Sequence, residues 1–217
     1  HNRHLFPQSQ NVHTLTSHVD LIPTMLGLAN LDITDLQNRM QNRFSDARPF
    51  VGRNLAPQIL GHDSSAIADD PVYFMTDDDV TRGQHQTNPL GEPYSSVIQP
   101  NHIETILTYL QRKGRIELWK FSRYFDNPKF WSEPGVQDVT LQPVEGKPGE
   151  WTTKVKTEPV PEEFELYNLT EDPLEAHNLA YPTLATVQSR SIQQWMNHLL
   201  AEQRSQKRLT PTQTATK

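Results

Sequence analysis

The chain has 217 residues, of which 35% are hydrophobic, and it contains 17 prolines, 9 glycines and no cysteine. This length fits one large domain or two small ones, and the many prolines indicate a core surrounded by long connections. The net charge is −6, and Lys and Arg are spread among the acids, which argues against a nucleic-acid partner. Without cysteine the chain has no disulfide, no thiolate metal site and no cysteine nucleophile.

No apolar run reaches ~18 residues, so the sequence predicts no membrane-spanning helix. The first residue is His rather than Met, and no signal-like segment follows it. We therefore expect a fragment or a processed piece of a longer protein, whose compartment the sequence does not predict.

The first predicted element is a helix over residues 17–31. Ser17 can cap it with Asp20 three residues later, as in a capping box, and Pro23 lies in the first turns. Apolar residues occupy two neighbouring faces, which is typical of a helix covered on most of its surface. We expect a sheet to pack on this helix and Asn30 to end it.

Shorter elements are expected in the rest of the first hundred residues. Residues 32–40 and 55–60 are predicted to form short helices. The compact apolar run at residues 71–76 is bounded by aspartates and predicts a buried strand. Residues 77–100 form a long polar loop, and loops of this length are usually functional or disordered.

The second half of the chain is predicted to form an antiparallel sheet and one long helix. The first two strands flank Gly114 as a β-hairpin, with Trp119 and Phe121 on one face. The helix is amphipathic, with Trp195 on its apolar side. The expected strands are residues 102–110, 115–125, 151–158 and 164–167, the expected helix is residues 183–203, and a disordered tail is expected from residue 204.

This order of elements predicts an α/β chain in three parts. Residues 1–100 are expected to be the edge of a large α/β domain. Residues 101–203 are expected to form a small subdomain of antiparallel strands with one covering helix, and residues 204–217 the disordered tail.

The stretch 163–180 connects the last strand to the helix. Asp172 is predicted to be an N-cap, and Pro173 the first residue of a single helical turn that stops at Asn178. The segment is predicted to be a structural corner between the sheet edge and the helix that covers the sheet.

Three stretches of the sequence resemble motifs of the sulfatase family. "ELYNLTEDPLEAHNLA" at residues 165–180 resembles the family's C-terminal Glu-Leu-Tyr-Asp-Leu strand followed by Asp-Pro-x-Glu-x-x-Asn-Leu-Ala. "TSHVDLIPTMLGLA" at residues 16–29 resembles Asp-Leu-x-Pro-Thr-Leu-Leu-x-Leu-Ala. "GRNLAPQILG" at residues 52–61 resembles Gly-x-x-Leu-x-Pro-Leu-Leu. The matches fall in patches between about residues 12 and 200 and correspond to the last third or so of a sulfatase.

The resemblance implies an alkaline-phosphatase-like α/β fold with a smaller C-terminal subdomain. Members of the family hydrolyse sulfate esters, of small molecules or glycans, with a formylglycine nucleophile made from Cys or Ser in a Cys/Ser-x-Pro-x-Arg motif. A divalent cation, usually calcium, holds the sulfate charge. Calcium and formylglycine are thus expected for the intact family member.

The catalytic motif of the family is not visible in this sequence. There is no cysteine, and Ser132-Glu133-Pro134 is followed by Gly135-Val136 without the required Arg. The resemblance therefore implies a C-terminal portion that is inactive by itself, with the N-terminal catalytic portion elsewhere. No catalytic, cofactor-binding or metal-binding residue is assigned to this chain.

The acidic run that follows the expected strand 71–76 is the best candidate for contact with a substrate. Loops at strand ends face ligands in α/β folds. In an intact sulfatase they could form a pocket wall. The alternative is a solvated loop, and an EF-hand does not fit because Arg82 stands where the loop requires Gly. The candidate wall residues are Asp77, Asp78, Asp79, Arg82 and His85.

Other polar residues are weaker candidates. His102, Arg123 and Tyr124 could share the same wall, although a sheet or surface role is the one expected for each. His18 is expected to be a cap partner. Asn168 begins an Asn-Leu-Thr glycosylation sequon, which matters only in a secreted eukaryotic protein.

Two other functions remain open from the sequence. The chain could be a degenerate remnant that acts as a binding or scaffold module. It could also belong to a related phosphatase or phosphonate hydrolase, because the matched segments do not report which oxyanion is cleaved.

Overall fold

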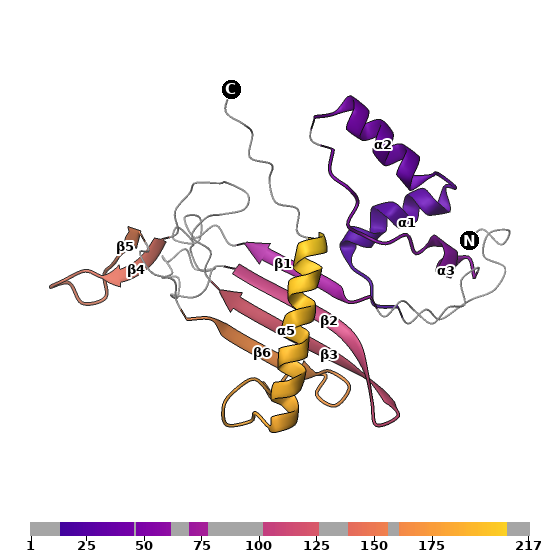
Figure 1. Ribbon diagram of the computed structural model, residues 1–217. Helices are drawn as coiled ribbons and strands as arrows, with labels where there is room; N and C mark the ends of the chain where they lie inside the picture. The colour runs from indigo at the N-terminus through magenta and orange to yellow at the C-terminus, as the bar shows by residue number, and fades with distance from the viewer. Residues whose placement is uncertain are drawn as a thin grey trace. The chain divides into compact units, whose positions relative to one another are not determined.

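The computed structural model describes residues 14–45, 47–61, 70–77, 102–125, 139–155 and 161–207 (Figure 1). Contacts divide the chain into two compact units. The first comprises His1–Tyr73, Leu107–Leu118 and Ala201–Leu209, and the second Phe74–Ile106, Trp119–Leu200 and Thr210–Lys217. The elements are η1 (His18–Asp20), α1 (Leu21–Leu28), α2 (Ile33–Arg43), α3 (Ala56–Ile59), β1 (Val72–Asp77), β2 (His102–Arg112), β3 (Arg115–Phe125), β4 (Val139–Pro143), β5 (Trp151–Val155), β6 (Glu163–Asn168) and α5 (Val187–Lys207).

Four strands form one sheet in the order β1-β2-β3-β6 (Figure 1). The predicted hairpin is confirmed, since β2 and β3 are joined at Lys113 and Gly114, which have φ values of 46° and 76°. Two positive φ values suit a tight hairpin turn. β6 runs antiparallel to β3, with Phe121 opposite Leu166. Helices and an antiparallel sheet together agree with the coarse mixed α and β class predicted from the sequence.

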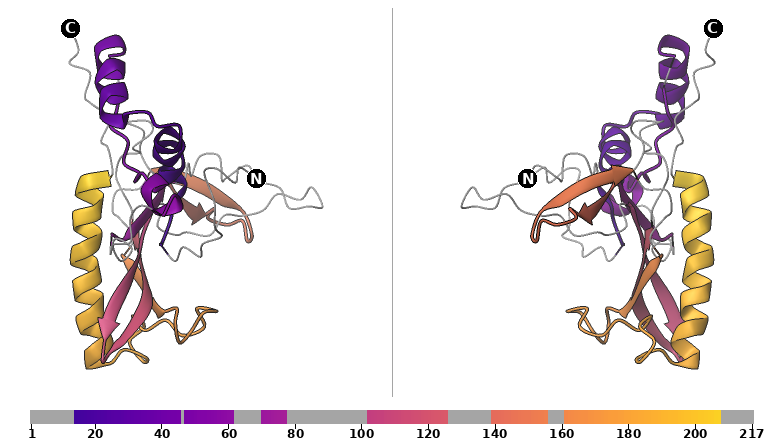
Figure 2. Two further views of the ribbon diagram at one scale, coloured as in Figure 1. Left: turned by 90° about the vertical axis from the view of Figure 1, so that its right-hand side faces the viewer. Right: turned by 90° about the vertical axis from the view of Figure 1, so that its left-hand side faces the viewer.

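In the second unit, α5 packs against one face of this sheet (Figure 2). On this face of the sheet, β2, β3 and β6 contribute the buried residues Ile106, Phe121 and Leu166. They lie under the apolar stripe of α5, whose buried residues Ile192, Met196 and Leu200 recur every four positions. The predicted covering helix is therefore present. The buried apolar residues of this core are Ile106, Trp119, Phe121, Phe125, Leu166, Ile192, Met196 and Leu200.

Three details of the predicted helix 183–203 are wrong. α5 begins at Val187 and continues to Lys207, so residues 204–207 are helical rather than part of a disordered tail. Residues 208–217 lie outside the described part of the chain. Trp195 is 41% exposed, whereas its neighbour Met196 is fully buried. Rotating α5 about its axis by one residue position would bury Trp195 and expose Met196. The sequence pattern alone does not distinguish these two orientations of the helix.

The predicted strand 151–158 exists in part, but it does not join the four-stranded sheet. β5 pairs with β4 in a separate two-stranded sheet, in which Pro143 is opposite Trp151. Gly146 and Gly149 take positive φ in the connection between them. Strand β4 was not predicted; it has only five residues and directly follows the turn-rich stretch 127–138.

The helices of the first unit follow the predicted boundaries closely. α1 ends at Leu28, and Asn30 takes the left-handed conformation with φ of 56°. The backbone N–H groups of Asn30 and Leu31 donate to Gly27 and Leu26, which satisfies the last carbonyl groups of the helix. The predicted end of this helix is confirmed.

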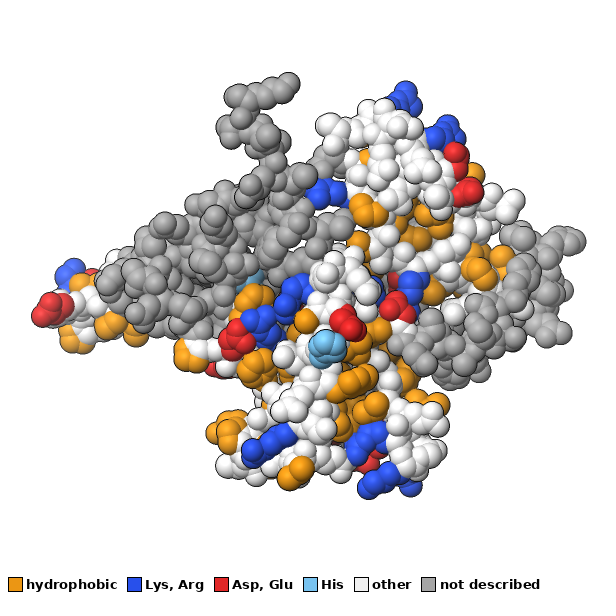
Figure 3. All heavy atoms as spheres, in the orientation of Figure 1, with side chains coloured by type: hydrophobic (Ala, Val, Ile, Leu, Met, Phe, Trp, Pro, Cys, Tyr) orange, Lys and Arg blue, Asp and Glu red, His pale blue; other side chains and the backbone are white. Residues whose placement is uncertain are grey.

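The expected cover of α1 is not seen among the described residues. Leu21, Ile22 and Met25 are 60%, 57% and 59% exposed, and Figure 3 shows hydrophobic side chains at the surface over α1. The buried positions of α1 are instead Pro23 and Thr24. The anchored side of α1 is therefore the one that carries Pro23 and Thr24.

The predicted boundary near residue 100 lies outside the described residues. β1, which precedes it, belongs to the same sheet as β2, which follows it. No helix in the described part of the chain is both long and apolar enough to cross a membrane.

Candidate functional site

The first two motif stretches are joined through Asp20, at the end of η1. Its side chain is only 4% exposed. The N–H of Ser17 donates to Oδ2 of Asp20 at 3.0 Å, as the predicted capping box requires. The backbone N–H of Arg53 donates to Oδ1 at 2.7 Å, and its guanidinium donates to Oδ2 at 2.9 Å. Burial raises the pKa of Asp20, but the hydrogen bonds from Arg53 and Ser17 outweigh it and lower the pKa overall.

Thr24 forms a second link between the same stretches. Its hydroxyl accepts from the N–H of Leu55 at 3.0 Å and donates to the carbonyl of Arg53 at 3.3 Å. Gly52 is required there, because a Cβ would lie 1.9 Å from the carbonyl oxygen of Val19. Thr24 thus binds the polar side of α1 to residues 53–55.

Arg53 also holds the start of β1. Its Nη2 donates to the carbonyl of Leu15 at 2.6 Å, and Nη1 donates to that of Asp70 at 3.3 Å. The carboxylate of Asp70 lies 3.3 Å from Nζ of Lys207, at the end of α5. Asp20, Arg53, Asp70 and Lys207 form a structural centre of alternating charges.

The third motif stretch closes the edge of the sheet. β6 is an edge strand, and its unpaired backbone groups would otherwise be open to another chain. Asn178 accepts from the N–H of Leu166 and donates to the carbonyl of Phe164, both at 3.0 Å. The N–H of Leu179 donates to the carbonyl of Leu166 at 2.8 Å. The predicted structural corner is confirmed in this respect.

The single helical turn predicted after Asp172 does not form. Glu175 takes a left-handed φ of 55°, which interrupts a helix at that point. Asp172 accepts instead from the N–H groups of Ala176 at 3.1 Å and His177 at 2.8 Å, four and five residues later. These backbone hydrogen bonds lower its pKa. Glu175 pairs with Lys120 at 2.6 Å, which places the loop on the side of the sheet opposite α5 (Figure 2).

Most of the predicted pocket wall lies outside the described residues. This applies to Asp78, Asp79, Arg82 and His85. Asp77 is the last residue of β1, and its side chain is not described. Figure 1 shows that β1 and β3 end, and β2 and β6 begin, at the same end of the sheet. Asp77 therefore leaves the sheet at the end where His102 enters it.

His102 and Arg123 meet at this end of the sheet. His102 is fully buried and stacks on Phe125 with ring centroids 5.4 Å apart. The guanidinium of Arg123 lies 4.2 Å from the centroid of the same ring. Its Nη1 is 3.8 Å from a carboxylate oxygen of the fully buried Glu104, and its Nε donates to Glu162 at 3.0 Å. These five residues are the sheet-end cluster.

The sheet-end cluster holds one guanidinium between two carboxylates. An arginine paired in this way is fixed in orientation. The sequence analysis missed Glu104 and Glu162. Glu104 had a detectable signal, because it alternates with His102 and Ile106 on the buried face of β2.

Tyr124 does not belong to this cluster. It lies on the other face of β3, and its hydroxyl donates to Glu165 at 2.8 Å. Burial, followed by the hydrogen bond to Glu165, raises the pKa of Tyr124 strongly. The structure therefore separates Tyr124 from His102 and Arg123, with which the sequence had grouped it.

Two further candidate residues have structural surroundings. Asn168 is buried, and its Oδ1 accepts from the N–H of Thr170 at 3.1 Å, so the sequon is not accessible in the folded protein. His18 lies in η1 and is exposed. Neither position offers a site for a ligand.

The described residues do not fit a metal site. Among them, no three His, Asp or Glu side chains lie close enough together to hold a metal ion. No calcium ligand is therefore assigned within the described ranges, and calcium stays an expectation from the resemblance.

Comparison of the chain with protein-family models, with curated proteins and with solved structures finds no match. The class that the fold itself defines is a mixed α and β chain with a helix-covered sheet and a sealed sheet edge.

Proposed function

We propose that this chain is the C-terminal portion of a sulfatase-like sulfuric ester hydrolase of the alkaline-phosphatase-like superfamily. Its role there is structural: it supplies the closing subdomain and part of the pocket wall, and the reacting groups come from the N-terminal portion. By itself the chain has no hydrolase activity.

One observation carries the proposal. Several residues that match the three family motifs hold the motif stretches to one another or to the sheet, and Arg53, at a position that its motif leaves unspecified, takes part as well. Asp20 and Thr24 fasten the first motif to the second, and Gly52 allows their close approach. Asp172 and Asn178 shape the third motif and seal β6.

The chemistry of the intact enzyme would come from outside the described residues. Formylglycine would supply the nucleophile, and a cation would hold the sulfate charge. The contribution proposed for this chain is limited to the end of the sheet. There Arg123 is held by Glu104 and Glu162, and Asp77 leads into the predicted wall. We derive no reaction step from these residues.

The test uses the protein translated from the complete reading frame, produced together with a formylglycine-generating enzyme. Hydrolysis of 4-nitrophenyl sulfate, 4-nitrophenyl phosphate and a phenylphosphonate ester is measured with calcium and with a chelator. We expect turnover of the sulfate ester that depends on calcium. The matched control replaces the Cys or Ser of the nucleophile motif by Ala.

The 217-residue chain serves as a second arm, and we expect no turnover from it above buffer. A preference for phosphate or phosphonate would assign the chain to a related hydrolase. A reading frame without any Cys/Ser-x-Pro-x-Arg motif, and without esterase activity, would contradict the proposal and favour a binding or scaffold module.

A further inference from the structure

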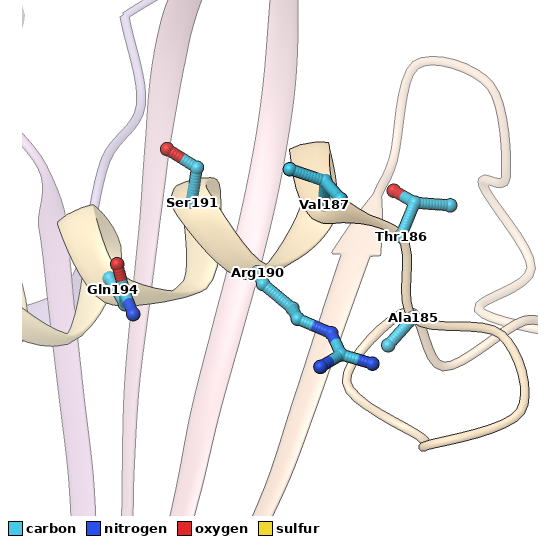
Figure 4. Close-up of a pocket in the computed structure, with 6 residues that line it drawn as sticks. All are labelled: Ala185, Thr186, Val187, Arg190, Ser191 and Gln194. Atoms are coloured by element: carbon cyan, nitrogen blue, oxygen red, sulfur yellow. The ribbon is translucent and has the colours of Figure 1, made fainter.

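Two adjoining hollows lie along the first turns of α5, in the second unit. Their volumes are about 690 Å³ and about 270 Å³. Arg190 and Gln194 line both hollows, which we together call the α5 groove. Figure 4 shows the lining residues of the larger hollow. The larger hollow has the size of small-molecule sites, ~300–1,000 Å³. The described lining residues are Phe121, Phe164, Ala185, Thr186, Val187, Arg190, Ser191, Gln193, Gln194 and Asn197.

The inner part of the α5 groove combines an aromatic ring with amides. Phe164 is half-buried and stacks on the fully buried Phe121, with centroids 5.9 Å apart and planes 9° apart. Gln193, Gln194 and Asn197 line the same hollow as this ring. Each amide can both donate and accept hydrogen bonds, as a ligand rich in hydroxyl groups requires.

The α5 groove carries a single charge among its described lining residues, the guanidinium of Arg190. Arg190 is exposed, and no carboxylate of the described residues pairs with it. Arg53 and Arg123, in contrast, are each held by carboxylates. Among the described lining residues Arg190 is thus a cation without a neighbouring acid, and on a chain of net charge −6 this favours an anionic ligand.

The start of α5 does not supply the binding groups. Thr186 and Ser189 cap each other, because the N–H of Ser189 donates to Oγ1 of Thr186 at 3.0 Å and the N–H of Thr186 donates to Oγ of Ser189 at 2.9 Å. Figure 4 shows the guanidinium of Arg190 extended away from the helix, on the side from which Gln194 also projects. The side chains, rather than the helix end, therefore define the site.

We propose that the α5 groove binds an acidic oligosaccharide. Arg190 pairs with a sulfate or carboxylate group, the three amides bond to hydroxyl groups, and the ring of Phe164 lies against the apolar C–H face of a sugar. A nucleic acid would require several cations for its phosphates, and the groove has one. The proposal does not rest on the proposed enzymatic function, because it uses only the side chains of the groove.

The test measures binding of three hexasaccharide probes to the full 217-residue chain by titration calorimetry at ~50 mM salt, low enough that charge contacts are not screened. Chondroitin sulfate offers sulfate and carboxylate groups, unsulfated chondroitin offers carboxylates alone, and a neutral dextran fragment offers hydroxyl groups alone. We expect both acidic probes to bind, and the neutral probe to bind at least tenfold more weakly. The ratio between the two acidic probes identifies the preferred anion.

Two variants make the test specific. Arg190→Gln is expected to weaken binding of the acidic probes at least tenfold, without a change in melting temperature. Arg115→Gln removes the same charge from an exposed position outside the groove and is expected to leave binding unchanged. Equal losses in both variants, equal binding of the neutral probe, or no binding of any probe at millimolar concentration would each overturn the proposal.

Discussion

Asp20 uses both of its carboxylate oxygens to bind Arg53, which lies 33 positions later in the chain. The pair joins two motif stretches, and Arg53 extends the connection to Leu15 and Asp70. Because Arg53 connects several segments of the chain, loss of its pair with Asp20 should destabilise the first unit as a whole. The consequences of this pair can be measured directly.

Asp20→Asn is expected to lower the free energy of unfolding by about 3 kcal/mol, because it removes the nearer of the two carboxylates that pair with the largely buried guanidinium of Arg53 and leaves only Asp70, at 3.7 Å. Urea denaturation measures the change. The matched control is Asp35→Asn, which breaks the exposed pair of Asp35 with Arg39 on α2. That control should change stability by less than about 0.5 kcal/mol. Similar effects of the two substitutions would contradict the role of Asp20.

The same pair predicts an acid dependence of stability. The pKa of Asp20 is lowered in the folded state, so below the ordinary aspartate pKa of ~3.9 the unfolded chain binds more protons than the folded one. The contribution of Asp20 is therefore complete above that pKa and is lost as the pH falls through the lower, folded value. Urea midpoints measured across this range should fall less steeply in Asp20→Asn than in the parent. If the urea midpoints of the parent and of Asp20→Asn fell in parallel with pH, the proposed contribution of Asp20 to acid stability would be contradicted.

Met196→Ala is expected to destabilise the protein by roughly 3 kcal/mol, because it empties a fully buried site under α5. Trp195→Ala removes a larger but half-exposed side chain and should cost less than about 1 kcal/mol, within the range of ordinary surface substitutions. Thermal melts of the two variants show which of the two side chains α5 buries against the sheet. A larger loss for Trp195→Ala would mean that the helix docks as the sequence pattern predicted.

Asn178→Ala is expected to cost about 1–3 kcal/mol, because it leaves the N–H of Leu166 and the carbonyl of Phe164 without their partner. It also opens the edge of β6, so light scattering on heating should increase. Asn38→Ala, at an exposed position of α2, is the matched control and should change neither quantity. An unchanged melting curve for Asn178→Ala would show that the edge is sealed without it.

The exposed apolar side of α1 predicts self-association of the isolated chain. Contiguous apolar patches above ~400 Å² are a liability in a monomer. The double substitution Ile22→Lys with Met25→Glu should therefore lower light scattering and raise solubility. Asn38→Lys with Gln41→Glu adds the same charges to α2 and should not. A parent chain that is already monomeric would contradict this prediction.

Local patterns were sufficient for several parts of the fold. The alternation around Gly114 predicted the hairpin and its apolar face, since the period of a strand is visible in a few residues. Ser17 with Asp20, and Asn30, marked a helix start and a helix end through their own backbone hydrogen bonds. The corner at residues 163–180 was recognised for the same reason. In each case the residues that decide the structure lie close together in the chain.

Only the tertiary structure decided which distant groups meet. Nothing near Arg53 indicates that Asp20 is its partner, and nothing near Arg123 indicates Glu104 and Glu162. The choice between Met196 and Trp195 as the buried residue depends on a rotation of α5 by one position, which the face of the sheet determines. Glu175, which takes the left-handed conformation, likewise pairs with Lys120, 55 positions earlier in the chain. These outcomes follow from contacts between segments, because burial and charge pairing act through space and a linear pattern records only neighbours.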